Sequence, residues 1–77
     1  MELNQDELKA HLMQTDDEFR RWASQHAEYD RMIAEMEAKG LLSPEEEIEE
    51  HRLKKLKLAA KDHMVEILSR YKTQAVH

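Results

Sequence analysis

The sequence contains no cysteine, only one glycine and one proline, and 5% aromatic residues. The absence of cysteine excludes a disulfide scaffold, a thiolate zinc site, an iron–sulfur centre and a cysteine nucleophile. The shortage of glycine and proline argues against a β-sheet protein, because strands are connected by turns that use these residues. The chain has 77 residues, the size of one domain. We therefore predict a single all-α domain over residues 1–77.

Long hydrophobic runs are also missing. The longest apolar runs span two or three residues, such as Leu12-Met13 and Leu41-Leu42, whereas a membrane-spanning helix needs about 20 apolar residues. The first residues show no basic stretch followed by an apolar core, as a secretory signal would. We expect a cytoplasmic protein without membrane contact.

Charged residues are abundant and unevenly distributed. They make up 38% of the chain and give a net charge of −5. Acidic residues dominate 1–18 and 41–50, whereas basic residues dominate 51–77. Such a high charge content together with 40% apolar residues is typical of long amphipathic helices. Most of the acids at 45–50 are explained by their place at a helix start, where the helix dipole favours anions.

Capping signals predict where the helices begin and end. Asn4 followed by Glu7 is typical of a capping box, so a helix should begin near residue 5. Gly40 is suited to the left-handed position after a helix that ends near residue 39. Ser43, with Pro44 next and Glu46 three residues on, should open the second helix. We expect helices over about 5–39 and 44–72, joined by a turn at 40–43.

The segment Thr15-Asp16-Asp17-Glu18 leaves two alternatives open. It resembles another capping box, with Thr15 as the cap, which would restart the helix after a kink within 14–17. It is equally compatible with a polar stretch inside one continuous helix.

Apolar spacing predicts an antiparallel, coiled-coil-like hairpin of the two helices. A turn centred near 41–42 would place Phe19 opposite Met64, Tyr29 near Leu53, and Leu12 near Tyr71. Trp22 would lie beside Ala60 and Lys61, where it could make a cation–π contact. The predicted hairpin seam consists of Leu12, Phe19, Trp22, His26, Tyr29, Ile33, Met36, Leu53, Leu56, Ala60, Met64, Ile67 and Tyr71.

A second, thinner stripe lies about 140–180° from this seam on the second helix, at 100° per residue. It comprises Leu58 and Val65, with His51 and Val76. A lone hairpin would leave this stripe in water and would bury little apolar surface. We therefore expect a homo-oligomer, with a dimeric four-helix bundle favoured.

A basic flank accompanies the stripe. Lys54, Lys57 and Lys61 share one side of the second helix. Three interpretations stay open, namely a solvated flank of the seam, a site for an acidic protein partner, and a site for nucleic acid phosphates. The negative net charge and the scarcity of aromatic residues disfavour nucleic acid.

Sequence motifs for catalysis or metal binding are absent. No two of the five histidines lie within one helical turn of each other, and no His-Glu-x-x-His motif occurs. The serines lack a glycine elbow, and a small hairpin offers no pocket for a substrate. We expect no enzyme activity, no catalytic, metal or cofactor-binding residues, no cofactor and no small-molecule substrate.

The residues of both helices resemble the YdcH-like family of small bacterial proteins, a domain of unknown function. The stretch Arg52-Leu53-Lys54-Lys55-Leu56-Lys57-Leu58-Ala59-Ala60-Lys61-Asp62 is similar to the family's LKKxKLxLKDE signature. Phe19 and His26-x-x-Tyr29-Asp30-x-x-Ile33 resemble its first-helix pattern F…HxxLDxxI. The chain departs from the family at Tyr29, Ala59, Ala60 and His63. The resemblance covers about residues 7–70 and implies a short helical hairpin in a bacterial cytoplasm, without a known reaction.

These patterns together predict a non-enzymatic protein-interaction or structural module that self-associates through its helical faces. Its partner-binding residues would be Leu58, Val65, Lys54, Lys57 and Lys61, and its protein partner is unknown. The alternative is a small RNA- or ribosome-associated factor that uses the same basic flank.

Overall fold

The computed structural model describes residues 4–75, with side chains as far as Lys72. These residues form three helices and no strand, namely α1 (Gln5–Thr15), α2 (Asp17–Ala38) and α3 (Pro44–Ala75). The prediction of an all-α fold is therefore confirmed. α3 continues three residues past the expected end near residue 72. Val76, assigned to the second stripe, lies outside the described residues.

The start of α1, the end of α2 and the start of α3 have the predicted capping interactions. The Asn4 side chain accepts a hydrogen bond from the Glu7 amide at 2.8 Å. Ser43 and Glu46 form a reciprocal capping box, with the Glu46 amide donating to Ser43 Oγ at 3.2 Å and the Ser43 amide donating to Glu46 Oε1 at 3.0 Å. Gly40 has φ of +83°, a left-handed conformation that glycine adopts without steric strain. Each end is therefore fixed by residues within one helical turn.

The first predicted helix is broken at Asp16, which separates α1 from α2. Asp16 has extended backbone torsions, and its side chain accepts from the Phe19 amide at 2.8 Å. Of the two alternatives left open by the sequence, the structure has the break within 14–17, with Asp16 and not Thr15 as the capping residue. The Thr15 hydroxyl instead donates back to the His11 carbonyl at 2.9 Å, as serine and threonine do inside helices. Asp16 caps α2 because its carboxylate reaches the amide three residues on.

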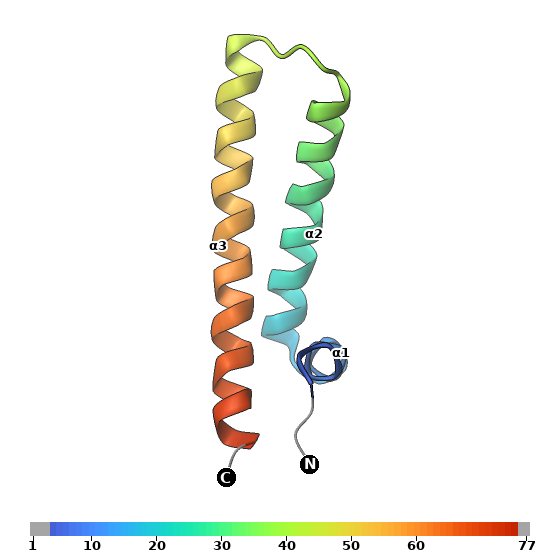
Figure 1. Ribbon diagram of the computed structural model, residues 1–77, viewed down its shortest axis with the longest axis vertical. Helices are drawn as coiled ribbons and strands as arrows, with labels where there is room; N and C mark the ends of the chain where they lie inside the picture. The colour runs from blue at the N-terminus through green and yellow to red at the C-terminus, as the bar shows by residue number, and fades with distance from the viewer. Residues whose placement is uncertain (1–3, 76–77) are drawn as a thin grey trace.

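The three helices form an elongated molecule of 52 × 19 × 16 Å. α2 and α3 lie side by side and run in opposite directions (Figure 1). α1 is seen almost end-on beside the start of α2, so it runs across the long direction of the other two helices. Among the described residues, no helix combines the length and the apolar content that crossing a bilayer requires.

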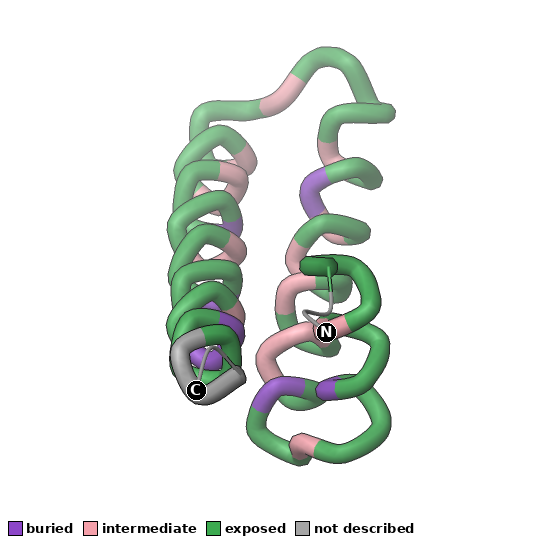
Figure 2. Tube along the Cα trace, turned by 60° about the horizontal axis from the view of Figure 1, so that its bottom comes forward, coloured by how far each residue is buried: buried purple, intermediate pink, exposed green. Residues whose placement is uncertain are grey.

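The core runs along the contact between α2 and α3 and is densest where α1 joins them. Leu12 of α1, Phe19 of α2, and Ile67 and Leu68 of α3 form one cluster of buried side chains. Figure 2 shows buried positions on all three helices at this end. Leu12 is fully buried, so α1 covers an end of the α2–α3 pair that would otherwise be open to water. Across the described residues, the buried apolar side chains are Leu12, Phe19, Ile33, Leu53, Ala60, Ile67 and Leu68.

Most residues of the expected hairpin seam lie between the helices. Six of them are buried, namely Leu12, Phe19, Ile33, Leu53, Ala60 and Ile67. Six more are half-buried, namely Trp22, His26, Tyr29, Met36, Leu56 and Met64. Tyr71 differs, because 37% of its surface is exposed and its hydroxyl donates to Asp16 Oδ2 at 2.8 Å. Tyr71 therefore makes a polar contact at the edge of the seam.

The pairing of α2 with α3 is displaced by two to four residues from the expected register. The Tyr71 hydroxyl meets Asp16, one turn after the expected neighbour Leu12. Trp22 stacks on His63 with ring centroids 4.0 Å apart, two positions beyond the expected neighbour Lys61. The displacement arises because the connection after Gly40 extends beyond the end of α2 before α3 begins (Figure 1). Part of the acidic start of α3 consequently extends beyond α2.

Candidate interaction surface

The predicted partner-binding residues gather along one groove between α2 and α3. This α2–α3 groove has a volume of about 500 Å³. Its wall on α3 includes the three lysines of the basic flank together with Leu58, and its wall on α2 includes His26, Asp30 and Glu37. A second hollow of about 450 Å³ contains Val65 and lies between α3 and the start of α1. The structure thus places the stripe and the basic flank on the same side of the molecule.

Leu58 and Val65 are strongly exposed for aliphatic residues. Their exposed fractions are 59% and 49%. They lie seven residues apart on α3, which places them about 20° from each other around the helix axis. His51 shares this direction around α3 and is also exposed. The stripe therefore combines two large apolar side chains that the described chain does not cover.

The basic flank is partly neutralised by neighbouring acids. Lys57 Nζ contacts Asp30 Oδ1 across the groove at 2.5 Å, and hydrogen bonding to Lys57 lowers the pKa of Asp30. Lys54 Nζ lies 3.6 Å from Glu50 on the preceding turn. Lys61 lines the same groove but forms no ion pair within residues 4–75. One unpaired ammonium group is therefore left on the flank, at the Lys61 end of the groove.

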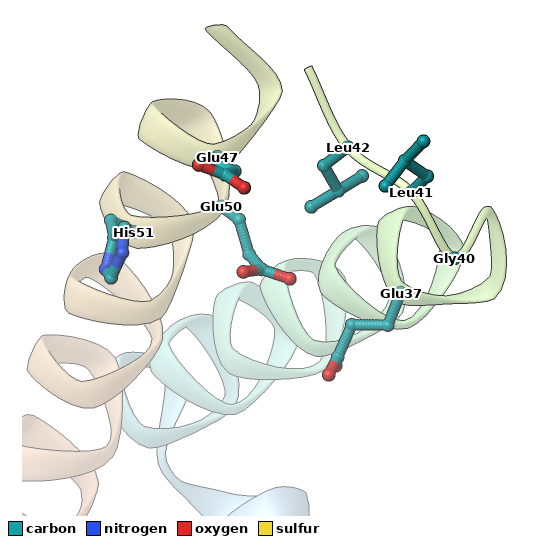
Figure 3. Close-up of a pocket in the computed structure, with 7 residues that line it drawn as sticks. All are labelled: Glu37, Gly40, Leu41, Leu42, Glu47, Glu50 and His51. Atoms are coloured by element: carbon teal, nitrogen blue, oxygen red, sulfur yellow. The ribbon is translucent and has the colours of Figure 1, made fainter. Parts of the chain in front are cut away.

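A third hollow lies beside the connection between α2 and α3. It measures about 530 Å³ and is lined by Gly40, Leu41, Leu42, His51 and three glutamates. Figure 3 shows Glu50 extending from α3 toward α2, and Glu37 on α2 is a further lining residue. Within the described part of the chain, no group of His, Asp and Glu side chains is arranged to hold a metal ion. We assign no chemistry to this hollow.

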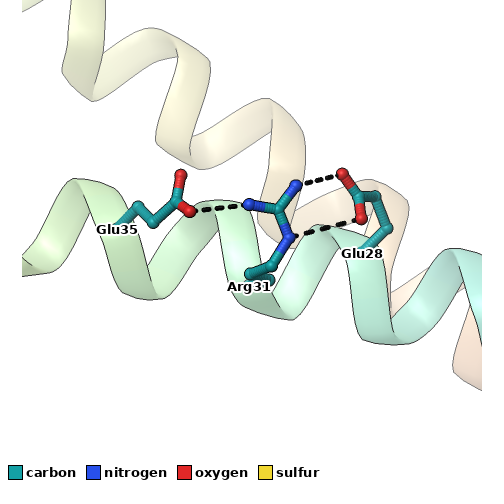
Figure 4. Close-up of polar contacts among 3 residues, drawn as sticks. All are labelled: Glu28, Arg31 and Glu35. Carbon is teal, nitrogen blue, oxygen red and sulfur yellow. Dashed lines mark hydrogen bonds and ion pairs between the residues drawn. The ribbon is translucent and has the colours of Figure 1, made fainter.

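The side of α2 that faces away from α3 carries intrahelical ion pairs. Arg31 bonds Glu28 one turn before it and Glu35 one turn after it (Figure 4). The contact with Glu28 is the main cause of the raised pKa of Arg31. More than half of each of these side chains is exposed. Exposed pairs at this spacing contribute little to stability, so we interpret this face as solvated.

A polar junction at the opposite end of the molecule was not predicted from the sequence. Asp16 accepts hydrogen bonds from the Phe19 amide and from the Tyr71 hydroxyl, both at 2.8 Å. These two bonds, with Phe19 contributing most, lower the pKa of Asp16. Arg70 lies 3.9 Å from Glu18 beside them. Only the heptad spacing, which brings Tyr71 to this end, could have indicated the contact.

Comparison with known proteins supports the resemblance seen in the sequence. Residues 19–68 match the model of a family described as a protein of unknown function (DUF465). No curated protein and no solved structure matches the chain. The matched region includes most of α2, the connection and α3 as far as Leu68, and it leaves out α1. The chain therefore belongs to the DUF465 family, which also contains the YdcH-like proteins.

Proposed function

We propose that this protein is a non-enzymatic interaction module that pairs with a second copy of itself through the stripe of Leu58 and Val65. The observation that carries the proposal is the exposure of these two side chains, 59% and 49%, beside the open hollows on one side of α3. Aliphatic side chains gathered on one exposed helix face are typical of surfaces that a partner covers.

The small core of the single chain supports association. Only seven apolar side chains among the described residues are buried, and many seam residues remain half-buried. Small domains bury a low fraction of their surface and commonly gain stability by oligomerisation. In our proposal, the antiparallel α2–α3 pair acts as a hairpin, and two such hairpins form a four-helix bundle.

The ion pairs of the basic flank favour a protein partner over RNA. Lys57 is paired with Asp30 and Lys54 with Glu50, so phosphate groups would have to displace carboxylates that are already in place. Lys61 would remain at the rim of the dimer, where an acidic protein surface could reach it. The RNA-associated alternative makes a separate prediction, because affinity for RNA would fall steeply with salt.

Sedimentation velocity with matched variants tests the proposal. We expect the wild-type chain to sediment as a dimer and Leu58→Glu/Val65→Glu to sediment as a monomer with unchanged helical circular dichroism. The control Leu41→Glu/Ile48→Glu introduces the same charges at residues that are 92% and 70% exposed elsewhere, and it should remain dimeric. A monomeric wild-type chain, or a dimeric stripe variant, would contradict the proposal.

A titration with an RNA oligonucleotide separates the alternative. We expect no salt-dependent binding by the wild-type chain. Tight binding that weakens as the salt concentration rises, and that is lost in Lys54→Glu/Lys61→Glu, would favour the RNA-associated factor instead.

A further inference from the structure

The junction between α1 and α2 differs from a continuous helix at one residue only. Asp16 has φ of −120° and ψ of 109°, and all its neighbours are helical. Its amide still donates to the Leu12 carbonyl at 2.8 Å, and its carbonyl still accepts from the Arg20 amide at 3.0 Å. Both are the i to i−4 bonds of an α-helix. Rotation at Asp16 alone would therefore join α1 and α2 into one helix.

Two sets of interactions compete at this junction. The closed arrangement is held by the bonds of Asp16 to the Phe19 amide and the Tyr71 hydroxyl and by burial of Leu12. A continuous helix would give up these contacts, but the amides of residues 17–19 would gain the carbonyls of residues 13–15. The apolar heptad spacing also continues across the break from Leu8 to Met36. The sequence thus supports both arrangements.

We infer that Asp16 is a hinge at which α1 opens, and that the opened α1 docks on the cluster of Phe19, Ile67 and Leu68 in a second copy. The occupant follows from the site itself, because this cluster already accepts Leu12 of the same sequence with Leu8 packed beside it. Exchange of an identical element between copies restores the burial of Leu12 that opening removes, although the bonds of Asp16 to the Phe19 amide and the Tyr71 hydroxyl are not regained. A one-residue connection favours such exchange. This exchange goes beyond the proposed function, and of the stripe only Val65 borders α1.

Two substitutions move the hinge in opposite directions. Both are placed in the Leu58→Glu background, which weakens the stripe at the residue that does not border α1. Asp16→Ala deletes the cap and should favour the continuous helix. Asp17→Pro should lock the closed form, because proline suits the first position of α2 and holds the preceding residue in the extended region that Asp16 already occupies. Asp17→Ala is the matched control, since it also removes the ion pair of Asp17 with Arg20.

Sedimentation over a concentration series measures the effect. Loss of an N-cap shifts a helix equilibrium about fivefold. An exchanged dimer opens two hinges, so Asp16→Ala should dimerise about 25-fold more tightly than the background. Asp17→Pro should stay monomeric, and adding it to Asp16→Ala should return that variant to a monomer. Equal sedimentation of Asp16→Ala and the background, or persistence of the dimer in Asp16→Ala/Asp17→Pro, would overturn the inference.

A spin label shows whether α1 docks on its own chain or on the other. The spin label is attached to Met13→Cys, on α1, in an Asp16→Ala chain that contains no ¹⁵N. This chain is mixed with a ¹⁵N-labelled Asp16→Ala chain that carries no spin label. We expect broadening of the Ile67 and Leu68 amide signals of the ¹⁵N chain. Unchanged Ile67 and Leu68 signals in the ¹⁵N chain would mean that α1 stays on its own chain, and this would overturn the exchange. Failure of the stripe prediction would leave this result unaffected.

Discussion

Replacement of Asp16 by alanine should destabilise the closed monomer measurably. The substitution removes the acceptor of the Phe19 amide at 2.8 Å and thereby the N-cap of α2. Loss of an aspartate cap typically costs about 1 kcal/mol, within a range of about 0.5–2. Urea unfolding of a small domain has a slope of about 1 kcal/mol per molar. We therefore expect the urea midpoint to fall by about 1 M at low protein concentration, where dilution suppresses exchange between copies.

Two further variants distinguish the role of Asp16 as the cap of α2 from its bond with Tyr71 of α3. Asp16→Asn keeps a good capping side chain but removes the carboxylate that accepts from the Tyr71 hydroxyl. Tyr71→Phe removes the hydroxyl alone. In a double-mutant cycle, the pair should show a coupling of favourable sign. Unchanged stability in Asp16→Ala, or an Asp16→Asn variant as unstable as Asp16→Ala, would refute the assignment of Asp16 as the cap.

The carboxylate of Asp16 should also make the stability of the protein depend on pH. The pKa of Asp16 is lowered from 3.8 in the folded chain, mainly by the Phe19 amide and then by Tyr71. Its contribution to stability is therefore fully present above pH 3.8 and is lost as the pH falls through the folded pKa. We expect Asp16→Asn to show a smaller loss of unfolding free energy than the wild type between pH 5 and pH 2. Parallel pH profiles of the two proteins would contradict this account.

Three further predictions concern other parts of the chain. Gly40→Ala should destabilise by about 1 kcal/mol, measured by urea unfolding, because φ is +83° while the space around the residue is open. Glu46→Gln should flatten acid unfolding between pH 4.5 and 2, because the Ser43 amide and then Lys39 lower the pKa of Glu46 from 4.5 to about 2; a steep profile in the variant would contradict this. Leu12→Ala should cost about 3 kcal/mol, since Leu12 is fully buried, and stability equal to the wild type would show that α1 does not seal the core.

The helix ends and the fold class could be predicted because they depend on short-range chemistry. The capping box of Ser43 and Glu46 and the left-handed Gly40 involve residues no more than three apart. Their interactions form wherever the local sequence allows them. Heptad spacing likewise identified the residues that lie between α2 and α3, because periodicity reports which side of a helix is apolar.

The register and the position of α1 could not be predicted because they depend on the path of the connection. Pairing was expected from a symmetric turn, but the segment after Gly40 carries α3 past the end of α2. Trp22 accordingly stacks on His63. The bond of Asp16 to the Tyr71 hydroxyl joins residues 55 positions apart. No local pattern contains that information.

The residues of the candidate surface could be predicted from the sequence, but the ion pairs of its lysines could not. The angle of Leu58 and Val65 around α3 predicted their position, and both are exposed. The pairing of Lys57 with Asp30 across the groove could not be read from α3 alone, because it requires knowledge of which α2 residue lies opposite. The basic flank therefore has less unpaired positive charge than its three lysines suggest from the sequence.

The contacts between α2 and α3 also imply an order of folding. Successive contacts join residues that lie further and further apart in sequence. Lys39 and Glu46 are seven residues apart, and Asp30 and Lys57 are 27 apart. Tyr71 and Asp16, joined by the hydroxyl bond, are 55 apart. Loop closure is easiest for the nearest pairs, so the helices should close from the connection toward α1. Substitutions near Gly40 should then act mainly on the folding rate, whereas those at the α1 end should act mainly on the unfolding rate.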